Sequence, residues 1–237
     1  MPVTIDLAVA KTHKSASRQS GDTVELVERP AGGFSVVVVD GQGSGAPAKS
    51  LSLRLAGHAT RLLNEGVRDG AAARAIHDFL FALRSGRVSA ALDIISVDLS
   101  TSSVLFTRNS EVPMLLRQNG QFELIQESAG RIGVYRHTRP RVLEYPATPG
   151  LLAILVTDGV IGAGARWGTR FDLLGEVESI VRPEATAEQI ASGLLQAAMD
   201  ADHGRPQDDM SVVVLLLGPA VSSQPVRRLA VSIPLIG

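Results

Sequence analysis

The chain has 237 residues, 45% of them hydrophobic, so it is long enough to bury a core without covalent cross-links. It contains no cysteine, which excludes disulfides, zinc–cysteine sites and thiol nucleophiles. Its 23 basic and 24 acidic residues give a net charge of −1, which argues against nucleic acid or an anionic membrane as a partner.

Strands and then helices are predicted in the first third of the chain. Short apolar or alternating runs bounded by Gly and Pro are typical of strands, and they occur at 5–10, 23–28 and 34–39. Apolar residues such as Leu51 and Leu55 then recur at helical spacing. Two helices that each cover a sheet are therefore predicted, at Ala46–Asn64 and Ala71–Leu83.

The rest of the chain predicts a series of short strands, a second helix pair and further strands. Turn signals such as Asn119-Gly120 separate the short strands, which are expected at 92–99, 104–107, 114–117, 122–125, 142–145 and 151–156. A Thr186-x-x-Gln189 capping box precedes the second of two helices, which are expected at 170–181 and 187–202. Final strands are expected at 210–217 and 228–233.

This order of elements favours antiparallel sheets faced by helices over a parallel, doubly wound sheet. We predict an α+β fold, a four-layer αββα sandwich in which two mostly antiparallel β-sheets are flanked by helices. No repeat or long Pro/Gly/Ser-rich linker divides the chain, so residues 1–237 are expected to form a single domain. Neither a signal sequence nor a run approaching the ~20 apolar residues of a membrane span occurs, so we expect a cytoplasmic protein.

Three of the most apolar predicted strands have an aspartate at one end. The strands ending at residues 39 and 156 lead into Asp40-Gly41 and Thr157-Asp158-Gly159, and the strand starting at 210 follows Asp208-Asp209. Buried strands hold their ends rigidly, and antiparallel neighbours bring two C-terminal ends beside one N-terminal end. Asp40, Asp158 and Asp208 are therefore predicted to converge.

Clustered carboxylates repel one another and destabilise a fold when buried without a partner, so a bound divalent cation is their natural counter-ion. A set of oxygen ligands favours Mg²⁺ or Mn²⁺. The glycines after Asp40 and Asp158 allow close approach of the backbone, and the Gly41 carbonyl is expected to be a further ligand. The alternative is that each Asp-Gly pair is only a turn, and recurrence of the same design at three strand ends leaves the turn and the metal site equally supported at this point.

Together these motifs resemble those of the metal-dependent PPM-type protein phosphatases, in particular the bacterial SpoIIE/RsbX-like branch. The resemblance covers roughly residues 21–217. Three motifs carry it in the family's order, namely Asp40-Gly41-Gln42-Gly43-Ser44-Gly45, Thr157-Asp158-Gly159 and Asp208-Asp209-Met210-Ser211. Each motif alone is weak, whereas the ordered set in matching strand contexts is specific.

For the metal ligands, the resemblance implies two divalent cations, Mn²⁺ or Mg²⁺. Asp40 would bridge both cations, Asp158 and Asp208 would complete one site, and the Gly41 carbonyl would serve the other. Asp22 matches an early acidic position that in the family helps to bind the second cation, mostly through water.

Other positions agree with the family only in part. Asp209 is a further metal-site position, where relatives have Asp or Asn. Arg18 lies four residues before Asp22, the spacing at which eukaryotic relatives keep a phosphate-binding arginine; the alternative is a solvated loop arginine. Gln42 replaces a histidine that is proposed to protonate the leaving group, so water would supply that proton. The segment 109–112 lacks the aspartate that supports a third metal in eukaryotic relatives.

The resemblance implies a protein serine/threonine phosphatase. A water or hydroxide that bridges the two cations would attack phosphorus in line, without a phosphoenzyme. Bacterial relatives in stress response and sigma-factor regulation act on phosphoserine or phosphothreonine in anti-sigma-antagonist proteins, so a phosphorylated regulatory protein is the expected partner. Because the domain fills the chain, we expect a stand-alone enzyme without a sensor module.

Two other functions are compatible with parts of the sequence. Residues 43–50 resemble a phosphate-binding P-loop with Lys49, but Ala48 replaces the required glycine and Pro47 removes an amide donor. A catalytically inactive phosphoprotein-binding module would keep the fold, although inactive relatives commonly lose metal-site aspartates that this chain retains.

Overall fold

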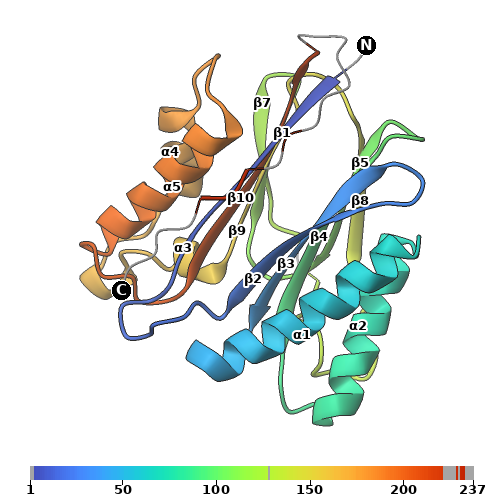
Figure 1. The fold of residues 1–237 in the computed structure, drawn as a ribbon. Coiled ribbons are helices and arrows are strands. Elements are labelled where there is room, and N and C mark those ends of the chain that lie inside the picture. The colour runs from blue at the N-terminus through green and yellow to red at the C-terminus, as the bar shows by residue number, and fades with distance from the viewer. Residues whose placement is uncertain (1–2, 128, 221–227, 229, 233–237) are drawn as a thin grey trace.

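The computed structural model describes residues 3–127, 129–220, 228 and 230–232. Its strands form two five-stranded sheets in which neighbouring strands run antiparallel (Figure 1). The first sheet has the order β1 (Val3–Thr12), β10 (Met210–Pro219), β9 (Leu152–Val156), β6 (Met114–Gln118) and β7 (Gln121–Ile125). The second has the order β2 (Asp22–Glu28), β3 (Gly33–Gly41), β4 (Ala90–Asp98), β5 (Ser103–Asn109) and β8 (Arg141–Pro146).

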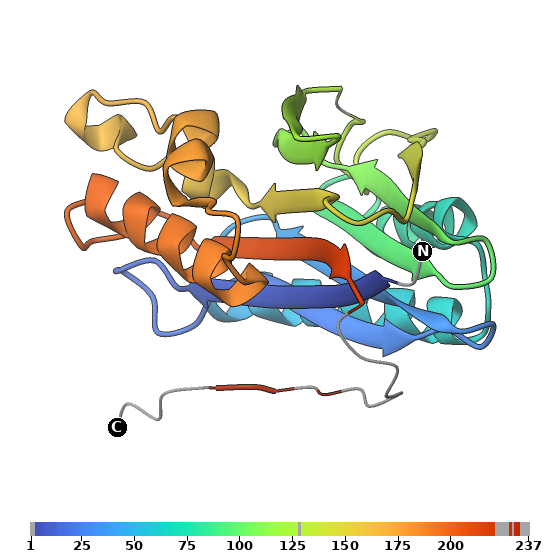
Figure 2. The same cartoon turned by 90° about the horizontal axis from the view of Figure 1, so that it is seen from above.

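Helices cover the outer face of each sheet, as Figures 1 and 2 show. Helix α1 (Gly45–Asn64) packs on β2 and β3 and is joined by α2 (Asp69–Arg84). On the other side, α5 (Ala187–Ala201) packs on β1 and β10 and contacts α4 (Leu173–Ile180). The two short helices are α3 (Asp158–Ile161) and the 3₁₀ turn η1 (Ala165–Trp167). The predicted α+β fold with four αββα layers is confirmed.

The apolar strands lie in the middle of the sandwich and are buried on both faces. In β3, Val36 and Val38 pack between the two sheets, whereas Val37 and Val39 pack under α1 and α2. Alternate side chains of a strand point to opposite faces, so a strand covered on both sides requires a continuous apolar run. The run of valines therefore fixes β3 rigidly up to Asp40.

Most predicted elements are present, with shifted ends. The helix expected from residue 170 begins at Leu173, because the Asp172 side chain accepts a hydrogen bond from the Gly175 backbone N–H and caps the helix there. The capping box of α5 is confirmed. The strand expected at 228–233 falls partly outside the described residues, and the described ones, 228 and 230–232, are not in a strand. Within the described chain, no helix is long and apolar enough to cross a membrane.

Truncating a buried side chain of α1 tests the packing of the outer helical layer. Leu55 is 0% exposed, whereas Leu53 on the same helix is 47% exposed. We expect Leu55→Ala to lower the free energy of unfolding by about 2–5 kcal/mol, because it removes apolar contacts and leaves a cavity. Leu53→Ala, the matched control, should change it by less than about 0.5 kcal/mol. Urea unfolding measures both, and equal losses would contradict this packing.

Candidate metal centre

Strand ends from both sheets meet at one end of the sandwich. In the second sheet, Asp22 opens β2 and is the register partner of Asp40 near the end of β3. In the first sheet, Asp158 follows β9, and Asp208 precedes β10, which pairs antiparallel with β9. An antiparallel pair puts the end of one strand beside the start of the next, so each sheet contributes two acids.

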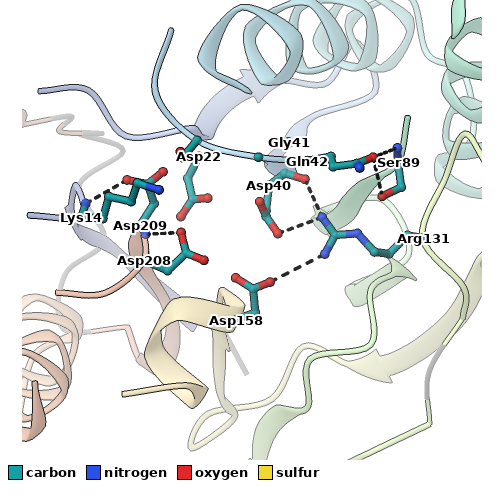
Figure 3. Close-up of a pocket in the computed structure, with 12 residues that line it drawn as sticks. Lys14, Asp22, Asp40, Gly41, Gln42, Ser89, Arg131, Asp158, Asp208 and Asp209 are labelled. Atoms are coloured by element: carbon teal, nitrogen blue, oxygen red, sulfur yellow. Dashed lines mark hydrogen bonds and ion pairs between the residues drawn. The ribbon is translucent and has the colours of Figure 1, made fainter. Parts of the chain in front are cut away.

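These acids line one pocket with a volume of about 430 Å³. Figure 3 shows the carboxylates of Asp22, Asp40, Asp158 and Asp208 around a common space. The remaining lining residues are Lys14, Gly41, Gln42, Gly43, Ser44, Ser89, Arg131 and Asp209. With five aspartates and two basic residues, the lining carries an excess of three negative charges when every acid is ionised.

Asp40 and Asp158 share the guanidinium of Arg131. Its Nη2 donates to Asp40 Oδ2 at 3.1 Å and to the Asp40 carbonyl at 3.3 Å, and its Nη1 lies 3.8 Å from Asp158 Oδ2. Burial and then the charge of Asp158 raise the pKa of Asp40 to about 6, although Arg131 opposes the shift. Burial and the charge of Asp208 also raise the pKa of Asp158. Both carboxylates would therefore be stabilised in their charged form by a cation.

Asp22 is held by hydroxyl groups from the other sheet. Its side chain is buried, and Oδ2 accepts hydrogen bonds from Thr157 Oγ1 at 2.9 Å and Ser211 Oγ at 2.7 Å. Burial raises the pKa of Asp22 to about 7, against the lowering effect of these hydrogen bonds. Lys11 and Lys49 both donate to the Asp22 backbone carbonyl, at 2.9 and 2.7 Å. Asp22 is thus fixed in place from both its side chain and its backbone.

Asp209 joins the start of β10 to the segment between β1 and β2. Its two carboxylate oxygens accept hydrogen bonds from the backbone N–H groups of Lys14, at 3.0 Å, and Gly21, at 2.7 Å. A Cβ on Gly159 would lie 2.2 Å from the Asp209 carbonyl, so this close approach of backbones requires glycine. The glycine of the Thr157-Asp158-Gly159 motif therefore has a steric role.

Gln42 is tied to the start of β4. Its backbone N–H donates to the Ser89 carbonyl at 3.2 Å, and its side-chain Oε1 accepts from the Ser89 N–H at 2.8 Å. A neutral amide in this position cannot act as a general acid. It instead fixes the loop that follows Asp40 and Gly41.

The family model described as Stage II sporulation protein E (SpoIIE) matches residues 30–217, which is most of the chain. The chain belongs to the SpoIIE family. Members of this family carry a PPM-type serine/threonine phosphatase domain, so the resemblance seen in the sequence is confirmed.

Curated SpoIIE relatives match most of this chain but extend well beyond it. Stage II sporulation protein E of Priestia megaterium is 23% identical over 218 residues, and that of Bacillus subtilis (strain 168) is 24% identical over 211 residues. The alignments cover 90% and 89% of this chain but 36% and 25% of the relatives. The chain therefore spans about a third of one relative and a quarter of the other.

Solved structures share the fold. The PP2C phosphatase domain of SpoIIE from Bacillus subtilis, with a fragment of its regulatory domain, gives a TM-score of 0.80 at 23% identity. That match covers 91% of this chain and 64% of the solved one. RsbX in complex with magnesium gives a TM-score of 0.67 at 17% identity and covers 90% and 96%. The likeness identifies a PP2C-like fold.

The pocket of this SpoIIE-family chain fits a divalent cation by its chemistry. Asp40, Asp158 and Asp208 offer carboxylate oxygens, the donors that Mg²⁺ and Mn²⁺ prefer, to a lining with excess negative charge. Across the described residues, no group of three or more Asp, Glu or His side chains is already arranged to hold a metal ion. Ligation would therefore require these side chains to close in.

The predicted site residues divide into two groups. Asp22, Asp40, Gly41, Asp158, Asp208 and Asp209 all line the pocket, whereas Arg18 is exposed and is not among the lining residues. Their roles as ligands stay a prediction. Lys49 of the suggested P-loop donates to the Asp22 carbonyl and the Thr23 hydroxyl and does not line the pocket. The sheet that contains β3, the strand before this loop, is antiparallel, whereas a P-loop fold has a parallel sheet.

Some residues of the site were missed in the sequence. Thr157 and Ser211 belong to the quoted motifs, so their hydroxyls could have been predicted to donate hydrogen bonds to an aspartate of the site. Lys14 and Arg131 lie in segments without a periodic pattern, and only the folded arrangement brings them to the pocket.

Removing the carboxylate of Asp209 should destabilise the metal-free protein. In Asp209→Ala, the N–H groups of Lys14 and Gly21 lose their acceptors, and Gly21 is buried, so we expect the free energy of unfolding to fall by about 1–3 kcal/mol. Asp208 is exposed and accepts one hydrogen bond, so Asp208→Ala should cost less than about 1 kcal/mol. Urea unfolding in chelator measures both, and the reverse order would contradict the structural role of Asp209.

The raised pKa of Asp22 predicts a pH-dependent stability. Between its ordinary value of 3.8 and about 7, folded Asp22 keeps a proton that the unfolded chain has released, so its contribution to stability falls as pH rises. Asp22→Asn removes this dependence while its amide oxygen still accepts from Thr157 and Ser211. In chelator, the stability of wild type relative to Asp22→Asn should fall by a few kcal/mol, on the order of 1.4 per pKa unit, across this range. Parallel profiles would contradict the shift.

Proposed function

We propose that this chain is a metal-dependent protein serine/threonine phosphatase. Its substrate would be phosphoserine or phosphothreonine on a regulatory protein of the anti-sigma-antagonist or stress-signalling type in the cytoplasm, with residues 1–237 acting as one domain. The observation that carries the proposal is the pocket in which strand-end aspartates of both sheets face a common space. Membership of the SpoIIE family supports the reaction class.

Two cations, Mn²⁺ or Mg²⁺, would be held by the pocket acids. Asp40 is the proposed shared ligand, Asp158 and Asp208 would complete one site, and the Gly41 carbonyl and Asp22 would serve the other; all five residues line the pocket (Figure 3). RsbX, a relative with the same fold, was solved with magnesium, which supports this choice. When bound, such cations supply Lewis-acid chemistry, which activates water and neutralises charge on the phosphoryl group.

The basic side chains of the pocket would orient the phosphate group of the substrate. Lys14 and Arg131 are the basic lining residues, and they would attract the phosphate dianion to an acidic pocket. Overall, the oxygen of water forms a bond to phosphorus while the bond from phosphorus to the serine or threonine oxygen breaks. Because Gln42 has no acidic proton, the leaving oxygen would take its proton from water.

Two observations argue against the nucleotide-binding alternative. The sheets are antiparallel, and Lys49, the candidate phosphate ligand, donates to the Asp22 carbonyl. The inactive phosphoprotein-binding module differs from the proposal only in turnover. It becomes an outcome of the experiment below, in which a phosphoprotein would bind without losing phosphate.

We expect the purified protein with Mn²⁺ to release phosphate from a phosphorylated anti-sigma-antagonist protein in preference to phosphotyrosine peptides and nucleotides. Excess chelator should abolish release, and Asp40→Asn and Asp158→Asn should lower kcat/KM by about 100-fold or more, because they weaken the cation site. Glu178→Gln, an exposed charge change on α4, should leave the rate unchanged. Phosphate release by malachite green assay and by mass spectrometry of the substrate measures these effects.

Three results would contradict the proposal. Full activity in chelator would exclude a cation-dependent reaction, and a preference for nucleotides or phosphotyrosine would exclude the substrate class. Tight binding of the phosphoprotein without phosphate release, at any tested Mn²⁺ or Mg²⁺ concentration, would indicate the inactive module.

A further inference from the structure

Arg131 places a positive charge between two of the pocket acids. Its guanidinium donates to the carboxylate and the backbone carbonyl of Asp40, and it lies 3.8 Å from the carboxylate of Asp158. These two acids come from different sheets, and Figure 3 shows Arg131 on the side of the pocket where both carboxylates point. One side chain therefore relieves the repulsion across the joint between the sheets.

The backbone of Arg131 is held, while its side chain has room to move. Ile132 exchanges both backbone hydrogen bonds with Ala90, at 2.9 and 3.1 Å, and its side chain is fully buried. The next residue, Gly133, donates its N–H to His77 Nδ1 at 3.1 Å. The Arg131 side chain itself is 24% exposed. Its guanidinium can thus leave the carboxylates without any change of the fold.

The other basic lining residue does not share this arrangement. Lys14 contacts Asp209 through its backbone N–H, and in the described structure it forms no ion pair with Asp40 or Asp158. Lys14 and Arg131 therefore contribute the same formal charge to the pocket but differ in their contact with the proposed ligands. This difference provides a matched control.

We propose that Arg131 is a resident counter-ion of the metal-free pocket, which a divalent cation must displace from Asp40 and Asp158 before it can bind. The inference rests on the proposed function, in which these two aspartates are ligands. A guanidinium and a divalent cation close to the same carboxylates repel each other, and Asp40 offers fewer free lone pairs while Arg131 is bonded to it. Arg131 thereby sets the cation affinity as a positioning residue, while it stabilises the pocket in the absence of metal.

The test is Mn²⁺ binding to the metal-free protein by isothermal titration calorimetry, which does not depend on turnover. We expect Arg131→Gln to bind Mn²⁺ about 10-fold more tightly or better, because the competing charge is gone. Lys14→Gln removes a charge of the same sign from the same pocket and should change the affinity by less than about 3-fold. Arg131→Lys keeps the charge without the two-pronged contact, so its affinity should lie between those of wild type and Arg131→Gln.

Thermal unfolding supplies an independent measurement, in which Arg131→Gln should lose stability although it gains affinity for Mn²⁺. In chelator, Arg131→Gln should melt at a lower temperature than wild type, because Asp40 and Asp158 then repel each other without a counter-ion. Saturating Mn²⁺ should narrow or reverse that difference. If Arg131→Gln does not fold, the comparison of Arg131→Lys with wild type decides the same question.

Unchanged or weaker Mn²⁺ binding by both Arg131 variants, relative to wild type, would overturn the inference while leaving the cation site intact. An affinity gain of equal size in Lys14→Gln would also overturn it, since diffuse charge would then explain the effect. If no variant binds Mn²⁺ or Mg²⁺, the proposed function fails as well. Binding by Arg131→Gln but not by wild type would support the displacement.

Discussion

Repulsion among like charges at one end of the sandwich is the constraint on which the site depends. Four strands, two from each sheet, have an aspartate at this end of the sandwich. The pocket lining has more acidic than basic residues. Such an arrangement persists only because the strands that carry the acids are held by apolar packing on both faces. The rigidity of β3, β9 and β10 thus keeps together charges that would otherwise separate.

The fold relieves this repulsion by a different means at each aspartate. Asp22 accepts hydrogen bonds from two hydroxyls, and Asp209 accepts them from two backbone amides, so both have partners within the fold. Asp40 and Asp158 instead share one partly exposed guanidinium, that of Arg131. Asp208 lines the pocket and is exposed. The three acids that the sequence pattern selects, Asp40, Asp158 and Asp208, are therefore held by other means than Asp22 and Asp209.

The sequence was informative wherever a feature is local. The valine run predicts β3 and the capping box predicts the start of α5. Each of the three main aspartates lies within two residues of an apolar run. Short elements carry no such period, so α3, which spans four residues, was not predicted. Arg131 could not be predicted because its position depends on the long-range backbone pair between Ile132 and Ala90. Arg18 is exposed and lies outside the pocket lining, so the phosphate contact that the resemblance suggested for it stays a prediction.

The N-terminal part of the site lies outside the segment matched by the family model. The match begins at residue 30, whereas the lining residues Lys14 and Asp22, and Gly21 next to Asp22, precede it and are held by contacts with the matched segment. The Asp209 carboxylate accepts hydrogen bonds from the backbone N–H groups of Lys14 and Gly21, and the hydroxyls of Thr157 and Ser211 donate to Asp22. Both sets come from the motifs that begin β10 and follow β9. The motif residues are therefore not only predicted ligands, because they also position Asp22, an acid that the matched segment itself does not contain.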